Sequence, residues 1–144
     1  MRKMAMMVAA VAALLELGAG SVLAQEGDAG SEVEGAKVAT DKAGNQRIQC
    51  TGVPCVATGR SDLVFERQGV GKKDRILLKG GDDQVRANTY TNDKDVIKGR
   101  DGFDLIYVDD GDTRDRIFGG KGNDKCYVDA RSEVVSGCSR IIVQ

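Results

Sequence analysis

The sequence has no histidine and no tryptophan, and it contains three phenylalanines, three tyrosines and one proline among 144 residues. The lack of histidine excludes a Ser-His-Asp or Cys-His catalytic unit, a histidine-ligated zinc and a histidine general base. The shortage of aromatic side chains removes the groups that usually build a compact core or a sugar-stacking platform. An enzyme would have to rely on paired carboxylates, so we expect a protein without enzymatic activity.

The first 24 residues have the pattern of a secretory signal peptide. Arg2 and Lys3 form a basic start, residues 4–15 form an apolar run, and residues 22–24 form a small-residue cleavage site. The apolar run is too short to span a bilayer. We therefore expect a secreted, extracellular chain with no membrane span after signal removal; a membrane anchor is the alternative.

The charges of the chain are nearly balanced. Without residues 1–24 the sequence keeps 19 Lys and Arg against 21 Asp and Glu, which gives no general argument for nucleic acid or an anionic membrane as partner. Residues 25–46 are rich in Gly, Ala, Glu and Asp without a sustained period, so they predict a flexible mature N-terminus. Residues 47–144 predict one domain.

The four cysteines of an exported chain predict two disulfides, for which three pairings exist. We favour Cys50 with Cys55 and Cys126 with Cys138, because each pair is close in sequence and lies at one end of the patterned region. Each disulfide is expected to cap one end of the domain, since open sheet edges invite aggregation.

The best-ordered motif is residues 119–127, Gly-Gly-Lys-Gly-Asn-Asp-Lys-Cys-Tyr. It fits the nonapeptide G-G-x-G-x-D-x-U-x, in which U is a large apolar residue. The same frame continues backwards as an acidic residue followed two places later by a side chain of a buried type. The aligned acidic residues are Asp62, Asp74, Asp83, Asp95, Asp104, Asp115, Asp124 and Glu133. Their U partners are Val64, Ile76, Val85, Ile97, Ile106, Ile117, Cys126 and Val135.

Each unit of this frame predicts a turn and a short strand whose U side chain points inward. Every second acidic residue is separated by 18 to 21 residues, so two units make one coil. The predicted fold is an all-β parallel solenoid, a β-roll or β-helix, of about four coils with disulfide-closed ends. An antiparallel β-sandwich is the alternative, but it has no reason to repeat the same chemistry at every turn.

Over residues 59–135 the sequence resembles the haemolysin-type (RTX) calcium-binding repeat proteins, with degenerate repeats. Residues 119–124 match the glycine-rich turn completely, residues 99–104 lack one glycine, and residues 80–83 are shifted and shortened. Residues 91–95 have no glycine, and Lys72 and Lys73 stand in another turn, where an internal cation is an alternative to a metal. The resemblance implies a β-roll whose turn carboxylates and backbone carbonyls bind calcium between successive coils.

Calcium takes six to eight oxygen ligands, which carboxylates and carbonyls of glycine-permitted turns can supply. The predicted calcium site consists of Asp83, Gly102, Asp104, Gly122, Asn123 and Asp124. Asp62, Asp82 and Asp101 are further metal candidates, and Asp109, Asp110 and Asp112 are expected to add negative charge near this edge. For Asp74, Asp95, Asp115 and Glu133 we expect an Asx-type turn, in which the side chain accepts from a backbone N–H two residues on.

The expected function is that of a secreted calcium-binding protein in which the metal supports folding after export. One alternative is a metal-free degenerate solenoid that acts as an extracellular structural or adhesion module. Another is an enzyme that uses Asp109 with Asp110 or Asp82 with Asp83, although adjacent strand residues point to opposite faces. The sequence indicates no particular protein or polysaccharide partner.

Overall fold

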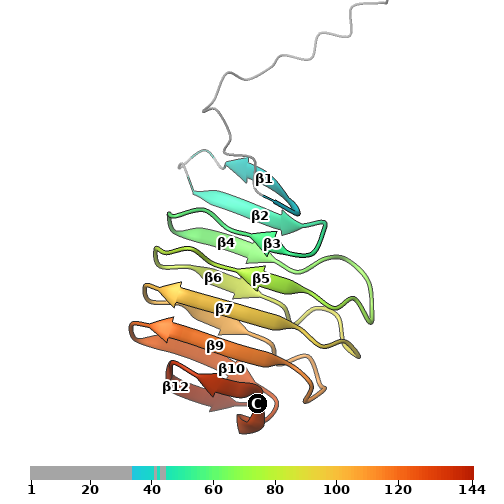
Figure 1. Cartoon of the computed structure of the whole chain (residues 1–144). Helices are drawn as coiled ribbons and strands as arrows, with labels where there is room; N and C mark the ends of the chain where they lie inside the picture. The colour runs from blue at the N-terminus through green and yellow to red at the C-terminus, as the bar shows by residue number, and fades with distance from the viewer. Residues whose placement is uncertain (1–33, 41, 43–44) are drawn as a thin grey trace, which may run out of the picture.

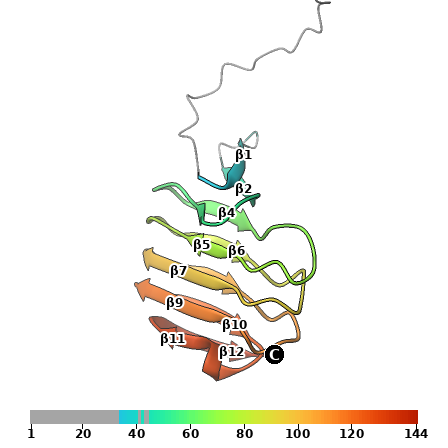
Figure 2. The same ribbon diagram turned by 45° about the vertical axis from the view of Figure 1, so that its right-hand side comes forward.

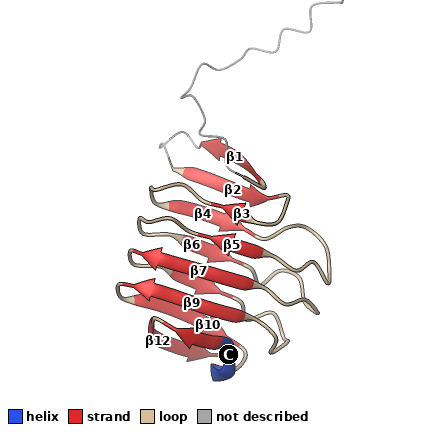
Figure 3. Cartoon of the chain, in the orientation of Figure 1, coloured by secondary structure: helices blue, strands red, loops and turns tan. Residues whose placement is uncertain are grey.

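The computed structural model describes residues 34–40, 42 and 45–144. The predicted signal peptide, residues 1–24, lies outside these residues, as does much of the segment 25–46. In the described part of the chain, no helical segment has the length and hydrophobicity that a bilayer span requires. The described residues are almost entirely strands, turns and loops, with one short 3-10 turn at Arg131–Glu133 (Figure 3).

The strands stack into a parallel β-solenoid, as predicted (Figure 1). One sheet has the strand order β1-β2-β4-β6-β8-β10-β12 and the other has the order β11-β9-β7-β5-β3, so from β2 onward the chain passes from one sheet to the other at each step. The described strands form about five turns, one more than predicted. The strands are β1 (Ala36–Thr40), β2 (Gln46–Cys50), β3 (Cys55–Val56), β4 (Asp62–Phe65), β5 (Arg75–Leu77), β6 (Gln84–Arg86), β7 (Val96–Asp101), β8 (Leu105–Tyr107), β9 (Arg116–Lys121), β10 (Asp124–Val128), β11 (Val134–Ser136) and β12 (Cys138–Val143).

The core is a double stack of U side chains between the two sheets. In the seven-stranded sheet, in-register pairing stacks Ile48, Val64, Val85, Ile106, Cys126 and Ile141. In the five-stranded sheet it stacks Cys55, Ile76, Ile97, Ile117 and Val134. The seven predicted U residues from Val64 to Cys126 are all 0% exposed, which confirms the frame over that range.

The prediction for the U residue of the eighth unit is wrong. Val135 is 45% exposed, and Val134 instead lies in register with Ile117. The last unit reaches its strand through the 3-10 turn Arg131–Glu133, and the register is irregular between Val134 and Ser136. The residue directly after Glu133 therefore points inward.

The solenoid has two different edges, one on each side of Figure 1. We call the side where β3, β5, β7 and β9 lead into β4, β6, β8 and β10 the glycine-turn edge. We call the opposite side, formed by residues 66–74, 87–95, 108–115 and 129–133, the long-loop edge. Figure 2 shows the same separation after rotation, with tight turns on the left and longer loops on the right.

Turns at the glycine-turn edge stack backbone on backbone. Gly102 has φ +139° and Gly122 has φ +137°, a region that favours glycine. A Cβ on Gly102 would lie 1.9 Å from the Gly81 carbonyl oxygen, and one on Gly122 would lie 1.6 Å from the Gly102 carbonyl oxygen. These glycines are therefore needed for the close approach of successive coils.

Both predicted disulfides form. Cys50 pairs with Cys55 at the N-terminal end, and Cys126 pairs with Cys138, which joins β10 to its neighbour β12 at the C-terminal end. The N-terminal end also differs from the flexible segment predicted over residues 25–46, because β1 lies within that range. The strand pairs antiparallel with β2 and covers a sheet edge that would otherwise stay open. Composition alone does not reveal such a partner strand.

Candidate metal centre

The acidic residues of the frame form two buried columns. On the glycine-turn edge, Asp62, Asp83, Asp104 and Asp124 are at most 3% exposed. Asp83 Oδ1 accepts from the Asp62 backbone N–H at 2.8 Å, and Asp104 Oδ1 accepts from that of Asp83 at 3.0 Å. Asp124 Oδ1 accepts from the Asp104 N–H at 2.9 Å. The carboxylates of Asp83, Asp104 and Asp124 thus each bind the backbone of the preceding coil.

The long-loop edge repeats this arrangement. Asp95 Oδ1 accepts from the Asp74 N–H at 2.7 Å, and Asp115 Oδ1 accepts from the Asp95 N–H at 2.7 Å. Glu133 Oε1 ends the column on the Asp115 N–H at 3.4 Å. The Asx-type turn expected for these residues is wrong. Asp95, Asp115 and Glu133 accept from the backbone one coil away, and Asp74 accepts from the backbone N–H and guanidinium of Arg67, seven residues before it. Glu133 Oε2 also accepts from the Ala130 N–H at 2.9 Å. The stacking of coils supplies a donor that no local pattern contains.

The second oxygen of most column aspartates has no partner. Among the described residues this holds for the buried Oδ2 atoms of Asp83, Asp95, Asp104, Asp115 and Asp124. In Asp62 the unpartnered oxygen is Oδ1, since its Oδ2 accepts from both the backbone N–H and the hydroxyl of Thr58 at 2.8 Å. Asp74 also differs, because the Arg67 guanidinium pairs with it. A buried ionised oxygen without a partner is unfavourable, so the columns lack counter-charge.

Burial raises the pKa of these carboxyl groups. On the glycine-turn edge, desolvation raises the pKa of Asp83 to about 7 and that of Asp104 to about 6, against the lowering effect of the backbone hydrogen bonds. On the long-loop edge, desolvation raises the pKa of Asp95 to about 9 and that of Asp115 to about 7, with neighbouring carboxylates adding to it. The ionised form is therefore less favourable on the long-loop edge.

Carboxylates converge in groups of three only on the long-loop edge, within the described residues. In each group, one oxygen from each member lies within 4.8 Å of the others. Because members are shared, the groups form one continuous acidic track. The groups are Glu66, Asp74 and Asp95; Asp93, Asp110 and Asp112; Asp93, Asp95 and Asp115; and Asp112, Asp115 and Glu133. Buried acidic groups that could bind a metal ion are thus present.

The residues of the sequence-predicted calcium site lie on the glycine-turn edge. Asp83, Asp104 and Asp124 stack there in one column, with Gly102 and Gly122 in the stacked turns. Asn123, Asp82 and Asp101 are exposed on the outside of the turns. Asp82 Oδ1 accepts from the Phe103 N–H at 2.9 Å, and Asp101 lies 3.9 Å from the Lys121 ammonium group. Calcium binding at this edge stays a prediction.

Sequence reasoning missed the acidic residues that complete the track. Glu66 and Asp93 stand outside the repeat frame, which assigns only one acidic residue to each unit. The expectation that Asp110 and Asp112 add charge beside the predicted site is wrong, since both lie in the loop 108–115 on the opposite edge. A usable signal was the extra aspartate two or three places before Asp95 and Asp115.

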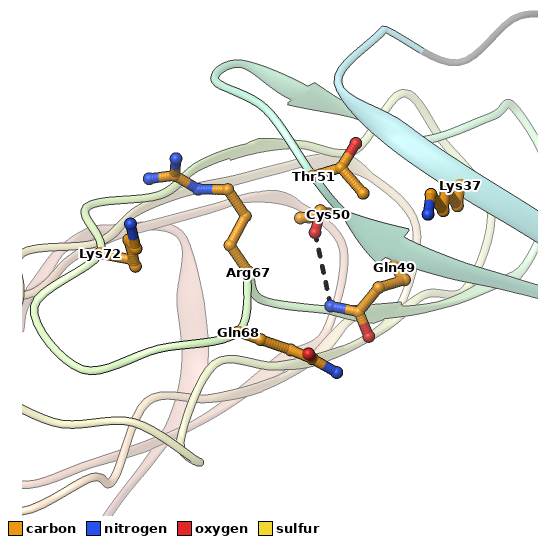
Figure 4. Close-up of a pocket in the computed structure, with 7 residues that line it drawn as sticks. All are labelled: Lys37, Gln49, Cys50, Thr51, Arg67, Gln68 and Lys72. Atoms are coloured by element: carbon orange, nitrogen blue, oxygen red, sulfur yellow. Dashed lines mark hydrogen bonds between the residues drawn. The ribbon is translucent and has the colours of Figure 1, made fainter.

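An open pocket of about 370 Å³, lined by no acidic side chain, lies near the N-terminal end of the solenoid. Figure 4 shows Lys37 from β1, Gln49 to Thr51 at the end of β2, and Arg67 to Lys72 from the first long loop around it. The lining is basic, but the Arg67 guanidinium already pairs with Asp74 and donates to the Lys73 carbonyl oxygen at 2.6 Å. The pocket offers no carboxylate, so it is not a cation site.

Comparison with known proteins gives no match: no family model, no curated protein and no solved structure matches this chain. The architecture and its buried acidic groups therefore carry the functional argument.

Proposed function

We propose that this chain is a secreted, non-enzymatic β-solenoid of the RTX-like type that binds calcium ions along its acidic edges. Calcium would support folding, because a site that forms only in the folded chain converts binding energy into folding energy. Two disulfides fit an oxidising, extracellular environment. The low calcium concentration inside cells would then leave the chain incompletely stabilised until export.

One observation carries the proposal: buried carboxylate oxygens without a partner, stacked coil above coil. Like charges at this spacing repel, and burial makes each ionised group less favourable. Calcium prefers oxygen ligands and tolerates irregular geometry. Calcium ions between successive turns would therefore supply the missing counter-charge, with Asp83, Asp104 and Asp124 contributing ligands turn by turn on the glycine-turn edge, assisted by carbonyl oxygens of Gly102 and Gly122 and by Asn123.

A calcium titration of the oxidised chain tests the proposal, followed by circular dichroism and thermal melting in chelator and at about 10 mM calcium. Extracellular modules bind calcium with dissociation constants of roughly 10⁻⁴ to 10⁻³ M. At one hundred times the dissociation constant, stability should rise by about 2.7 kcal/mol. Magnesium at the same concentration serves as the control and should act more weakly. A melting curve identical in calcium and chelator would refute the proposed function.

A metal-free structural or adhesion module is the second candidate. It is favoured by the carboxylate-to-backbone hydrogen bonds, which join successive coils without any ion. Raised pKa values also let part of these carboxyl groups stay protonated near neutral pH. This candidate predicts a cooperative melt in chelator that collapses on reduction of the disulfides. It further predicts that adding calcium does not change the melting curve, either of the wild type or of the variant that combines Asp104→Ala with Asp124→Ala.

A further inference from the structure

We propose that the long-loop edge contains a calcium site outside the repeat frame, centred on Asp93 and completed by Asp110 and Asp112. The site joins the loop 87–95 to the loop 108–115 of the next coil. It rests on the proposed calcium-binding function, but it uses residues that neither the frame nor the glycine-rich turns assign.

The burial of Asp93 is the central observation. Asp93 is 3% exposed, and neither of its carboxylate oxygens has a partner among the described residues. It lies within 4.8 Å, oxygen to oxygen, of Asp110 and Asp112. It also lies within the same distance of Asp95 and Asp115 in a second group. An aspartate buried in this way has no protein group that compensates its charge.

Basic side chains near Asp93 are directed elsewhere. Lys94 is exposed to solvent although it follows Asp93 directly. Arg114 Nη1 donates to Asn92 Oδ1 at 2.9 Å. The ion pairs of the described residues join Arg67 to Asp74 and Lys121 to Asp101, so none involves this group. An internal cation therefore does not replace a metal here.

The two loops are already held in place around the group. Asp112 Oδ2 accepts from the backbone N–H groups of Asn92 at 2.8 Å and Asp93 at 3.2 Å. Asn92 has φ +69°, the left-handed conformation that turns the loop toward the group. Asp110 Oδ1 accepts from the Asp112 N–H at 2.9 Å, which leaves its buried Oδ2 without a partner. Three oxygens without a partner, two from Asp93 and one from Asp110, are thus available for a ligand. Asp112 Oδ1 accepts from the Arg114 N–H at 2.9 Å, so Asp112 would bind an ion through a remaining lone pair of a carboxylate oxygen.

These oxygens lie close enough together to share one calcium ion. Calcium binds oxygen at about 2.3 to 2.6 Å in flexible geometry, and one oxygen from each of the three carboxylates lies within 4.8 Å of the others. Water completes the six to eight ligands that calcium takes. Magnesium requires near-ideal octahedral geometry at shorter distances, so an irregular set of carboxylates from two loops suits calcium better.

The test compares Asp93→Asn with the wild-type chain by isothermal titration with calcium chloride and by thermal melting in chelator. We expect the variant to lose one calcium equivalent, or to bind it at least about tenfold more weakly. In chelator it should melt at the same temperature as the wild type or higher, because the substitution removes a buried charge. Asp109→Asn is the matched control, since Asp109 accepts from Asn88 Nδ2 at 3.1 Å and belongs to none of the groups.

The outcomes separate this proposal from the proposed function. If the wild type binds calcium and Asp93→Asn titrates like it, the Asp93 site is refuted while calcium binding at the glycine-turn edge stands. If the wild type binds no calcium, both fail. Asp110→Asn is the second variant if Asp93→Asn does not fold, and an unchanged stoichiometry in it would equally refute the site. Loss of the equivalent in either variant, with Asp109→Asn unaffected, supports it.

Discussion

The two edges of the solenoid carry the same column of buried acidic residues but join successive coils differently. At the glycine-turn edge, strand pairing continues through the turn, as Arg100 with Gly120 and Asp101 with Lys121 show. At the long-loop edge, carboxylates accept from loop backbones, as Glu66 does from the N–H groups of Thr89 and Tyr90 at 2.7 and 3.1 Å. The glycine-turn edge adds strand pairing to its column of carboxylates, whereas the long-loop edge relies more on carboxylates that accept from loop backbones.

This difference explains where the negative charge gathers. A tight turn that stacks on the next turn pairs much of its backbone with that turn, so it needs few aspartates besides the column residue. A longer loop leaves more backbone N–H groups without strand partners, and acidic side chains accept from these groups. Asp112 accepts from the Asn92 N–H, and Asp129 Oδ2 accepts from the Gly111 N–H at 2.8 Å. The long loops therefore bring more carboxylates close together, and their mutual repulsion favours the binding of a cation.

The largest expected effect is the loss of stability when a glycine is replaced, which should be greater at the glycine-turn edge than at the long-loop edge. Gly122→Ala places a Cβ 1.6 Å from a backbone oxygen at φ +137°, so it should lower the free energy of unfolding by about 3 to 5 kcal/mol. Gly111→Ala is the control, because its φ of +97° is strained but no atom lies within 4 Å of the added Cβ. Its cost should be about 1 to 2 kcal/mol. Urea denaturation of both variants measures this, and equal losses would contradict the stacked-turn account.

The next effect is the pH dependence of the metal-free chain. Folding raises the pKa of these carboxyl groups from 3.8 to about 6 for Asp104, about 7 for Asp83 and about 9 for Asp95. A raised pKa contributes stability that is complete below the unfolded value and lost as the pH rises through the folded value. Stability in chelator should therefore fall as the pH rises from about 4 to about 9.

The upper end of the pH window distinguishes the edges. Asp83→Asn with Asp104→Asn should reduce the dependence near pH 6 to 7, to which Asp115 on the long-loop edge also contributes, and Asp95→Asn should remove the part that extends toward pH 9. Chemical denaturation at several pH values in chelator measures both. Calcium should weaken the dependence, because it binds the ionised carboxylates. A metal-free stability that rises between pH 6 and pH 9 would contradict the assigned shifts.

The smallest effect concerns the one column aspartate on the glycine-turn edge whose Oδ2 is satisfied by protein groups. Thr58→Val removes the hydroxyl that donates to Asp62 Oδ2 at 2.8 Å and should cost about 1 kcal/mol. Ser61→Ala, in the same turn, loses only an exposed acceptor 3.3 Å from the Asp82 nitrogen and should cost less than about 0.5 kcal/mol. Thermal melts in calcium and chelator should show the same loss for Thr58→Val. A larger loss in calcium would place a metal at Asp62.

Much of the fold followed from the repeat frame. Seven U positions, both acidic columns and the two disulfide pairs were predictable, because a repeated turn and strand leave little freedom in how coils stack. Strand β1 was not predictable, since its pairing with β2 depends on an open edge and not on its own composition. Val134 takes the inward position predicted for Val135, because the 3-10 turn Arg131–Glu133 shifts the last unit by one residue.

By itself the sequence determined the period, the core and the placement of one acidic residue per turn, since these depend on local spacing. Only the tertiary structure decided which carboxylates meet. Glu66, Asp93 and Asp112 lie in loops of neighbouring coils, and they reach the frame aspartates because the sheets hold those coils in register. The distance between such groups is set by backbone pairing elsewhere in the coil, so no spacing within a single loop could reveal it.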